Sequence, residues 1–230
     1  MKTLLWKDYR LNRLLLIFGS VVCVGPWAIA ITRHYQLLHR GGNDWWGPEP
    51  WVSTAGITLG LCLITIAMLG GTAVAAERAD RSAEFLAYLP VSRWKILAAK
   101  SCVALTAMAA IWLVNLGFLL LVAPRIAEDV YAVEIVRRSE VRELFIILGP
   151  LSILLFGAGW FWSVVLRSHG LATGMSVFTL AVIVMGTIGI EHGLGVEGFL
   201  TNQTLATLFL AVGIGGYIAG CLTYLYRMEP

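Results

Sequence analysis

Six long stretches without a charged residue constrain this 230-residue chain more than any other feature. All 17 basic and 14 acidic residues lie outside these stretches. A helix needs about 20 apolar residues to cross roughly 30 Å of hydrocarbon, and a charge at its centre would cost about 2.5–3.5 kcal/mol. The sequence therefore predicts six spanning helices. The third span is expected to begin a few residues before its charge-free stretch. The expected spans are 14–32, 52–76, 97–123, 144–166, 171–190 and 203–226.

The overall composition excludes most other classes of protein. Apolar types make up 58% of the residues and charged types 13%, against about 45–50% and about 25% in soluble domains. Disordered chains have the opposite imbalance, and a soluble enzyme would lack polar residues to cover its surface. Continuous apolar runs favour helices over the alternating strands of a membrane barrel. We expect residues 1–230 to form one all-α transmembrane domain.

The basic residues predict the orientation of the chain. Six spans place both termini on one side, and that side would hold eleven of the 17 Lys and Arg residues. Basic residues are enriched in cytoplasmic loops. We therefore expect a multi-pass protein of the plasma or inner membrane with both termini in the cytoplasm.

Residues 2–13 mix basic side chains with Leu and aromatic residues. This composition suits a short helix that lies in the inner interface and leads into the first span. A charged flank that only sets the topology would have a similar composition, so both interpretations stay open.

The four cysteines all fall within predicted spans, where they are typical small apolar fillers. The sequence contains no Cys-x-x-Cys or His-Glu-x-x-His pattern. We expect no disulfide, no metal site and no cofactor. The cysteines are Cys23, Cys62, Cys102 and Cys221.

Small residues and short turns predict how the spans pack. Gly56 and Gly60, and likewise Gly216 and Gly220, have the spacing that lets helices approach closely, which favours internal packing over a dimer seam. The four residues 167–170 predict a tight turn between the fourth and fifth spans, with Gly170 in the left-handed position that often ends a helix.

The longest inner segment, 77–100, divides into two parts. Residues 78–88 contain good helix formers, and Pro90 would stop that helix because it has no N–H group. Ser92 is then a suitable N-cap for the third span. The pattern predicts a short helix across the membrane surface followed by a rigid corner, although an ordinary interfacial helix would look alike.

The same segment resembles the inner-loop motif of type-two ABC transporter permeases. The matching residues are Glu77-Arg78, then Ser82-Ala83-Glu84-Phe85-Leu86, then Leu89-Pro90-Val91-Ser92-Arg93, and finally Lys100. Arg81-Ser82-Ala83 stands where Gly-Thr-Leu is usual in that family.

The resemblance implies a permease subunit of an ATP-driven transporter, an exporter that forms its pathway as a homo- or heterodimer. Its inner helix would be a coupling helix that docks on a separate ABC ATPase subunit. The chain itself would not be an enzyme, since no Gly-x-x-x-x-Gly-Lys-[Ser/Thr] motif occurs. Arg81, Glu84 and Phe85 would contact the ATPase. The full set of expected coupling residues is Arg81, Ser82, Glu84, Phe85, Pro90, Ser92 and Arg93.

Three other functions are known for chains with several spanning helices, and the sequence bears on each of them. An ion-coupled secondary transporter usually carries Asp, Glu or His within its spans, and the six charge-free stretches contain none. An intramembrane enzyme would need a nucleophile near a base, which Asn115, Ser152, Ser163 and Ser176 do not provide in a recognisable pattern. A membrane anchor or assembly subunit without transport activity remains an alternative.

Overall fold

The computed structural model describes residues 2–39, 49–79, 92–122, 139–194 and 201–227. Within these ranges the chain is helical and contains no strand. The elements are α1 (Lys2–His39), α2 (Glu49–Thr72), α3 (Ala75–Ala79), α5 (Arg93–Gly117), the π-helical turn η1 (Phe118–Val122), α8 (Ser139–Val165), α9 (His169–Leu194) and α10 (Asn202–Arg227).

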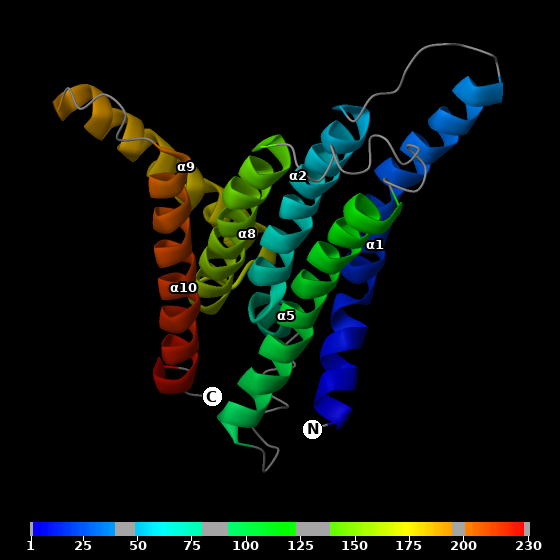
Figure 1. Cartoon of the computed structure of the whole chain (residues 1–230). Coiled ribbons are helices and arrows are strands. Elements are labelled where there is room, and N and C mark those ends of the chain that lie inside the picture. Colours follow the sequence, from blue (N-terminus) through cyan, green and yellow to red (C-terminus); the bar gives the residue numbers. More distant parts are fainter. Residues whose placement is uncertain (1, 40–48, 80–91, 123–138, 195–200, 228–230) are drawn as a thin grey trace.

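Six of these helices, found among the described residues, are long and apolar enough to cross a membrane. They are α1, α2, α5 with η1, α8, α9 and α10, so the prediction of six helices able to span a membrane is confirmed. Figure 1 shows the first residues of α1 and the last residues of α10 at the same end of the bundle. That end, which also carries α3 and the start of α5, is called the basal end below.

The N-terminal segment is part of the first long helix. α1 runs without interruption from Lys2 to His39 and continues through Pro26. Residues 2–13 are therefore helical, as expected, but they form the first turns of α1 rather than a separate helix. Their position in the membrane interface stays a prediction.

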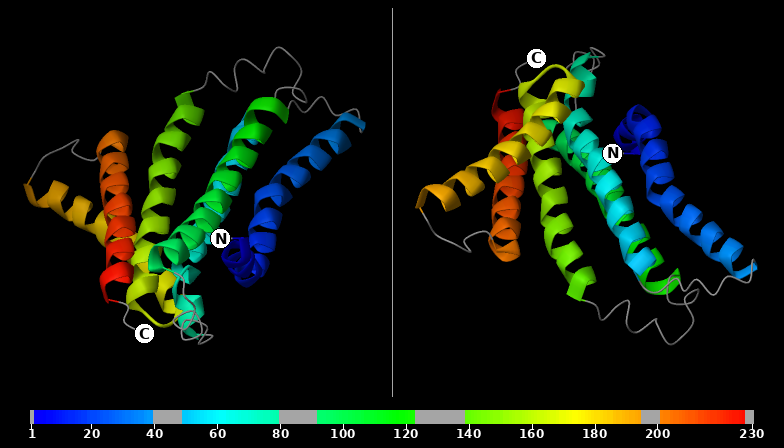
Figure 2. Two further views of the ribbon diagram at one scale, coloured as in Figure 1. Left: turned by 90° about the horizontal axis from the view of Figure 1, so that it is seen from below. Right: turned by 90° about the horizontal axis from the view of Figure 1, so that it is seen from above.

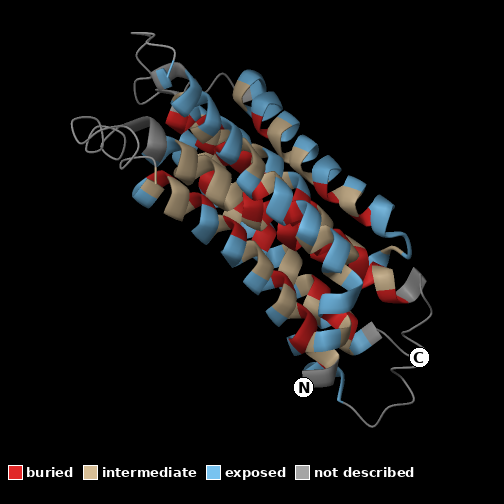
Figure 3. Cartoon of the chain, turned by 90° about the vertical axis from the view of Figure 1, so that its right-hand side faces the viewer, coloured by how far each residue is buried: buried red, intermediate tan, exposed pale blue. Residues whose placement is uncertain are grey.

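α2 lies at the centre of the bundle and contacts α1, α5, α8 and α9, while α10 packs mainly against α8. Figure 2 shows α1 on one side of this group and α9 diverging from it on the other. Figure 3 shows buried positions between the helices and exposed positions along their outer faces. The outward apolar side chains suit contact with lipid, as expected for a membrane domain.

Glycines bring the backbones of α8 and α10 into direct contact. A methyl group on Gly213 would lie 2.6 Å from the Ile153 carbonyl oxygen, and one on Gly216 would lie 3.1 Å from the Gly157 carbonyl oxygen. Gly220 faces Phe161 in the same way. The predicted small-residue motif on α10 is thus confirmed as internal packing.

The corresponding motif on α2 makes no close backbone contact. Gly56 faces only the side chain of Leu144, and a methyl group on Gly60 would meet nothing within 4 Å. Close approach of α2 to α8 instead uses Gly70, where a methyl group would meet the backbone of Phe156 and Trp160.

A polar contact deep in the bundle joins α1 to α5. The Trp27 Nε1 donates to Asn115 Oδ1 at 3.1 Å, and Asn115 Nδ2 donates to the Ile111 carbonyl oxygen at 2.9 Å and to Cys23 Sγ at 3.1 Å. Asn115 is almost fully buried. Its amide is satisfied within the bundle, as a polar group in hydrocarbon requires.

The turn between α8 and α9 is short, but the predicted role of Gly170 is wrong. α8 ends at Val165, and Gly170 is the second residue of α9. The turn is closed by Ser168, whose Oγ accepts a hydrogen bond from the Leu171 N–H at 3.4 Å. A serine N-cap that starts α9 replaces the glycine stop expected for α8.

The glycine contact between α8 and α10 leads to a first prediction. Gly213→Ala should lower stability by about 1–3 kcal/mol, because the added methyl group overpacks a backbone contact. Gly215→Ala is the matched control, since a methyl group there meets nothing within 4 Å. Thermal unfolding in detergent measures both, and equal melting temperatures for the two variants would contradict the proposed contact.

Candidate functional site

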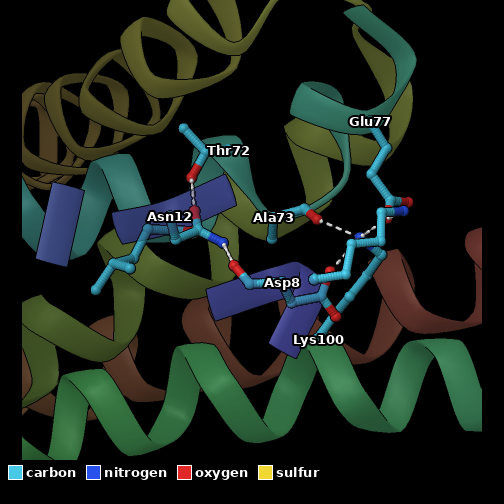
Figure 4. Close-up of polar contacts among 8 residues, drawn as sticks. Asp8, Asn12, Thr72, Ala73, Glu77 and Lys100 are labelled. Atoms are coloured by element: carbon cyan, nitrogen blue, oxygen red, sulfur yellow. Dashed lines mark hydrogen bonds and ion pairs between the residues drawn. The ribbon is translucent and has the colours of Figure 1, made fainter. Parts of the chain in front are cut away.

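Four charged side chains meet at the basal end of the bundle, where α1, α3 and α5 converge. Lys100 Nζ lies 2.9 Å from Glu77 Oε1 and 3.6 Å from Asp8 Oδ1, and Lys7 Nζ lies 2.7 Å from the same Glu77 oxygen. Figure 4 shows Lys100 between the two acids. We call Lys7, Asp8, Glu77 and Lys100 the charge cluster.

Three helices contribute the residues of the charge cluster. Lys7 and Asp8 lie early in α1, and Glu77 is on the short α3 that follows α2. Ala73 lies between α2 and α3, so its carbonyl group is available at a helix end. Lys100 Nζ donates to that Ala73 oxygen at 3.0 Å, which also ties α5 to the backbone after α2.

The cluster is buried but electrically balanced. The side chains of Lys100, Glu77 and Asp8 are only 3%, 5% and 7% exposed. Removing such charges from water costs several kcal/mol each, and only good pairing offsets this. Two acids and two bases provide that pairing.

Glu77 titrates differently from a free glutamate. Burial raises its pKa, but the nearby Lys100 ammonium, followed by Lys7, lowers it more strongly, so its net pKa lies below the ordinary value. Glu77 is therefore an anion at neutral pH and holds both lysines.

A second polar contact, beside the cluster, joins α1 to the end of α2. Thr72 Oγ1 donates to Asn12 Oδ1 at 3.3 Å, and Asn12 Nδ2 donates to the Asp8 carbonyl oxygen at 2.9 Å. Asn12 follows Asp8 by one helical turn, so successive turns of α1 contact α5, through Asp8, and the end of α2, through Asn12 (Figure 4). The start of α1 is therefore attached to α3 and α5 through the cluster and to α2 through Asn12.

Two of the sequence-predicted coupling residues lie within the described ranges. Ser92 is at the predicted N-cap of α5, in extended conformation, and its backbone carbonyl accepts from the Lys95 N–H at 2.9 Å, although its hydroxyl makes no capping bond. Arg93 Nη1 donates to the Leu225 carbonyl oxygen of α10 at 3.4 Å. The other predicted residues lie outside the described ranges: Arg81, Ser82, Glu84, Phe85 and Pro90.

The charge cluster was not predicted as a site. Glu77 and Lys100 bracket the resembling segment, but their contact with each other, and with Asp8, is tertiary. The sequence signal for Glu77 and Lys100 was their place in the resembling motif, just after the predicted second span and near the start of the third. Such charges are expensive there unless they are paired.

The arrangement joins helices and does not resemble a catalytic site. Among the residues that the structure describes, no group of three or more His, Cys, Asp or Glu side chains could hold a metal ion. The candidate nucleophiles are bonded to their own helices: Ser152 Oγ donates to Gly149, Ser163 Oγ to Trp160 and Ser176 Oγ to Thr173 carbonyl oxygens.

Comparison with known protein families gives one match. The family model described as ABC-2 family transporter protein matches residues 12–212. This range includes α2, α3, the 80–91 segment and α5. No curated protein and no solved structure matches the chain.

The burial of Lys100 leads to a second prediction. Lys100→Met should cost about 3–5 kcal/mol of stability, because it leaves the buried Glu77 and Asp8 without their shared cation. Lys95→Met, at an exposed position on the same helix, should change stability by less than about 0.5 kcal/mol. Melting temperatures in detergent compare the two.

A triple variant tests whether unpaired buried charge is the reason for the loss of stability expected of Lys100→Met. Asp8→Asn, Glu77→Gln and Lys100→Met together remove both acids with the base, so part of the lost stability should return. If Lys100→Met alone melts at the wild-type temperature, the cluster does not hold the helices together.

Proposed function

Since the chain belongs to the ABC-2 transporter family, we propose that it is the permease subunit of an ATP-driven exporter. Two permease chains would form the pathway, and a separate ATP-binding subunit would supply the energy. The whole chain would act as one transmembrane domain with both termini in the cytoplasm. Six apolar helices and the excess of basic residues at the basal end support this orientation.

The charge cluster is the observation that carries the proposal. Segment 80–91 begins three residues after Glu77 in the sequence and ends one residue before Ser92. Glu77 is paired with Lys7 on α1 and Lys100 on α5. Movement of this segment would therefore reach three helices at once, as a coupling element requires.

The residues that follow segment 80–91 have their own attachment to the bundle. Ser92 is the N-cap of α5, and Arg93 donates to the carbonyl group of Leu225 near the end of α10. With Pro90 fixing the preceding backbone, this corner would transmit displacement to α5 and α10. We assign contact with the ATPase to Arg81, Glu84 and Phe85, and the corner to Pro90, Ser92 and Arg93. Ser82 belongs to the same coupling segment.

The third prediction tests coupling directly. Affinity purification of the chain from its native membrane should recover an ABC ATPase subunit. Glu84→Lys combined with Pro90→Ala should leave the chain inserted but should remove most of the effect of the permease on ATP hydrolysis. Phosphate release by the purified complex measures this effect.

A control separates loss of coupling from loss of folding. Arg142→Gln changes a charge at the exposed start of α8, at the opposite end of the bundle, and should leave ATP hydrolysis unchanged. Recovery of no ATP-binding subunit with the wild-type chain would exclude the proposal. Recovery of the subunit without any ATP-driven transport would instead indicate a membrane anchor.

A further inference from the structure

A groove of about 500 Å³ opens at the basal end between α1, the end of α2 and the start of α9. Its wall is largely apolar. Leu11, Leu14, Leu15 and Phe18 line it from α1, and Met68 lines it from α2. Leu14 is 81% exposed, so the groove is open on its outer side.

The lining changes from polar to apolar along the groove. Asn12, Thr72 and His169 lie toward the basal end, whereas Phe18 and Met68 lie deeper in the bundle. Leu11 and Phe18 are seven residues apart, which is about 10 Å along a helix. The groove therefore changes from polar to apolar in the same direction as a phospholipid changes from headgroup to acyl chain. Its polar part lies at the membrane surface.

Basic residues surround the polar end. Arg10 precedes Leu14 by four residues, so it lies on the same face of α1, one turn closer to the surface. Arg167 and His169 lie on the other side, at the turn before α9, and all three are exposed.

The described residues that line the groove include no acid. The nine lining residues are Leu11, Asn12, Leu14, Leu15, Phe18, Met68, Thr72, Ala76 and His169. The charge around the polar end is therefore basic, and it complements an anionic group.

We propose that an anionic phospholipid of the cytoplasmic leaflet occupies this groove. One acyl chain lies along Leu11, Leu15 and Phe18, and the phosphate lies near Arg10, Arg167 and His169. Because lipid tails are as apolar as leucine, the acyl chain provides fit, and the basic residues decide which lipid binds. The inference rests on the proposed function only for the identity of the leaflet.

The bound lipid would lie next to the charge cluster. Asn12 and Thr72 line the groove and are hydrogen-bonded to each other, and Asn12 also donates to the Asp8 backbone. A lipid in the groove would thus contact the attachment of α1 to α2.

Native mass spectrometry of the purified chain tests the proposal. Phosphatidylglycerol and phosphatidylcholine with the same acyl chains are titrated separately. The wild-type chain should bind phosphatidylglycerol several-fold more tightly. Arg10→Gln with Arg167→Gln should remove most of this preference, and the control Arg142→Gln should keep it.

A second variant tests the groove itself. Leu14→Trp should fill the groove and weaken binding of both lipids, whereas Ile29→Trp, at an exposed position of α1 outside the groove, should not.

Equal binding of the two lipids by the wild-type chain would overturn the proposal. Disulfide cross-linking of Leu14→Cys between two chains would also overturn it, because a second copy would then cover the groove. None of these measurements needs the ATP-binding subunit, so they fail or succeed independently of the proposed coupling.

Discussion

The buried ammonium group of Lys100 is the constraint on which the basal end of the bundle depends. A charge that is only 3% exposed requires nearby acids, and these come from α1 and α3. Asp8, Glu77 and Lys100 are distant in sequence, so their contact fixes three elements relative to one another. Lys7 balances the second acid and keeps the cluster neutral.

The rest of the bundle is held together in a different way. Lipid tails give no hydrophobic force between helices, so association depends on close packing and hydrogen bonds. α8 and α10 use close packing, because Gly157, Gly213 and Gly216 let their backbones touch. α1 and α5 use hydrogen bonds instead, through Trp27 and Asn115.

These two kinds of packing give the proposed coupling a physical basis. The backbone contact between α8 and α10 leaves little room for relative movement, since packed backbones resist deformation. α1 and α5 are joined by side-chain contacts instead, and both meet Glu77 beside segment 80–91, so displacement of that segment would reach the two helices together. The lipid groove borders the same junction from the side of α1.

The sequence by itself determined the membrane class, the six spans and the helical state, because apolar length and backbone hydrogen bonding are local requirements. It also located the start of α5 at Ser92, since a cap depends on neighbouring residues. It did not identify the partners of Asp8 and Lys100, and it misassigned Gly170, where Ser168 caps α9 instead. Only the tertiary structure decided these points, because the energy of a buried charge depends on which distant residues the fold brings beside it.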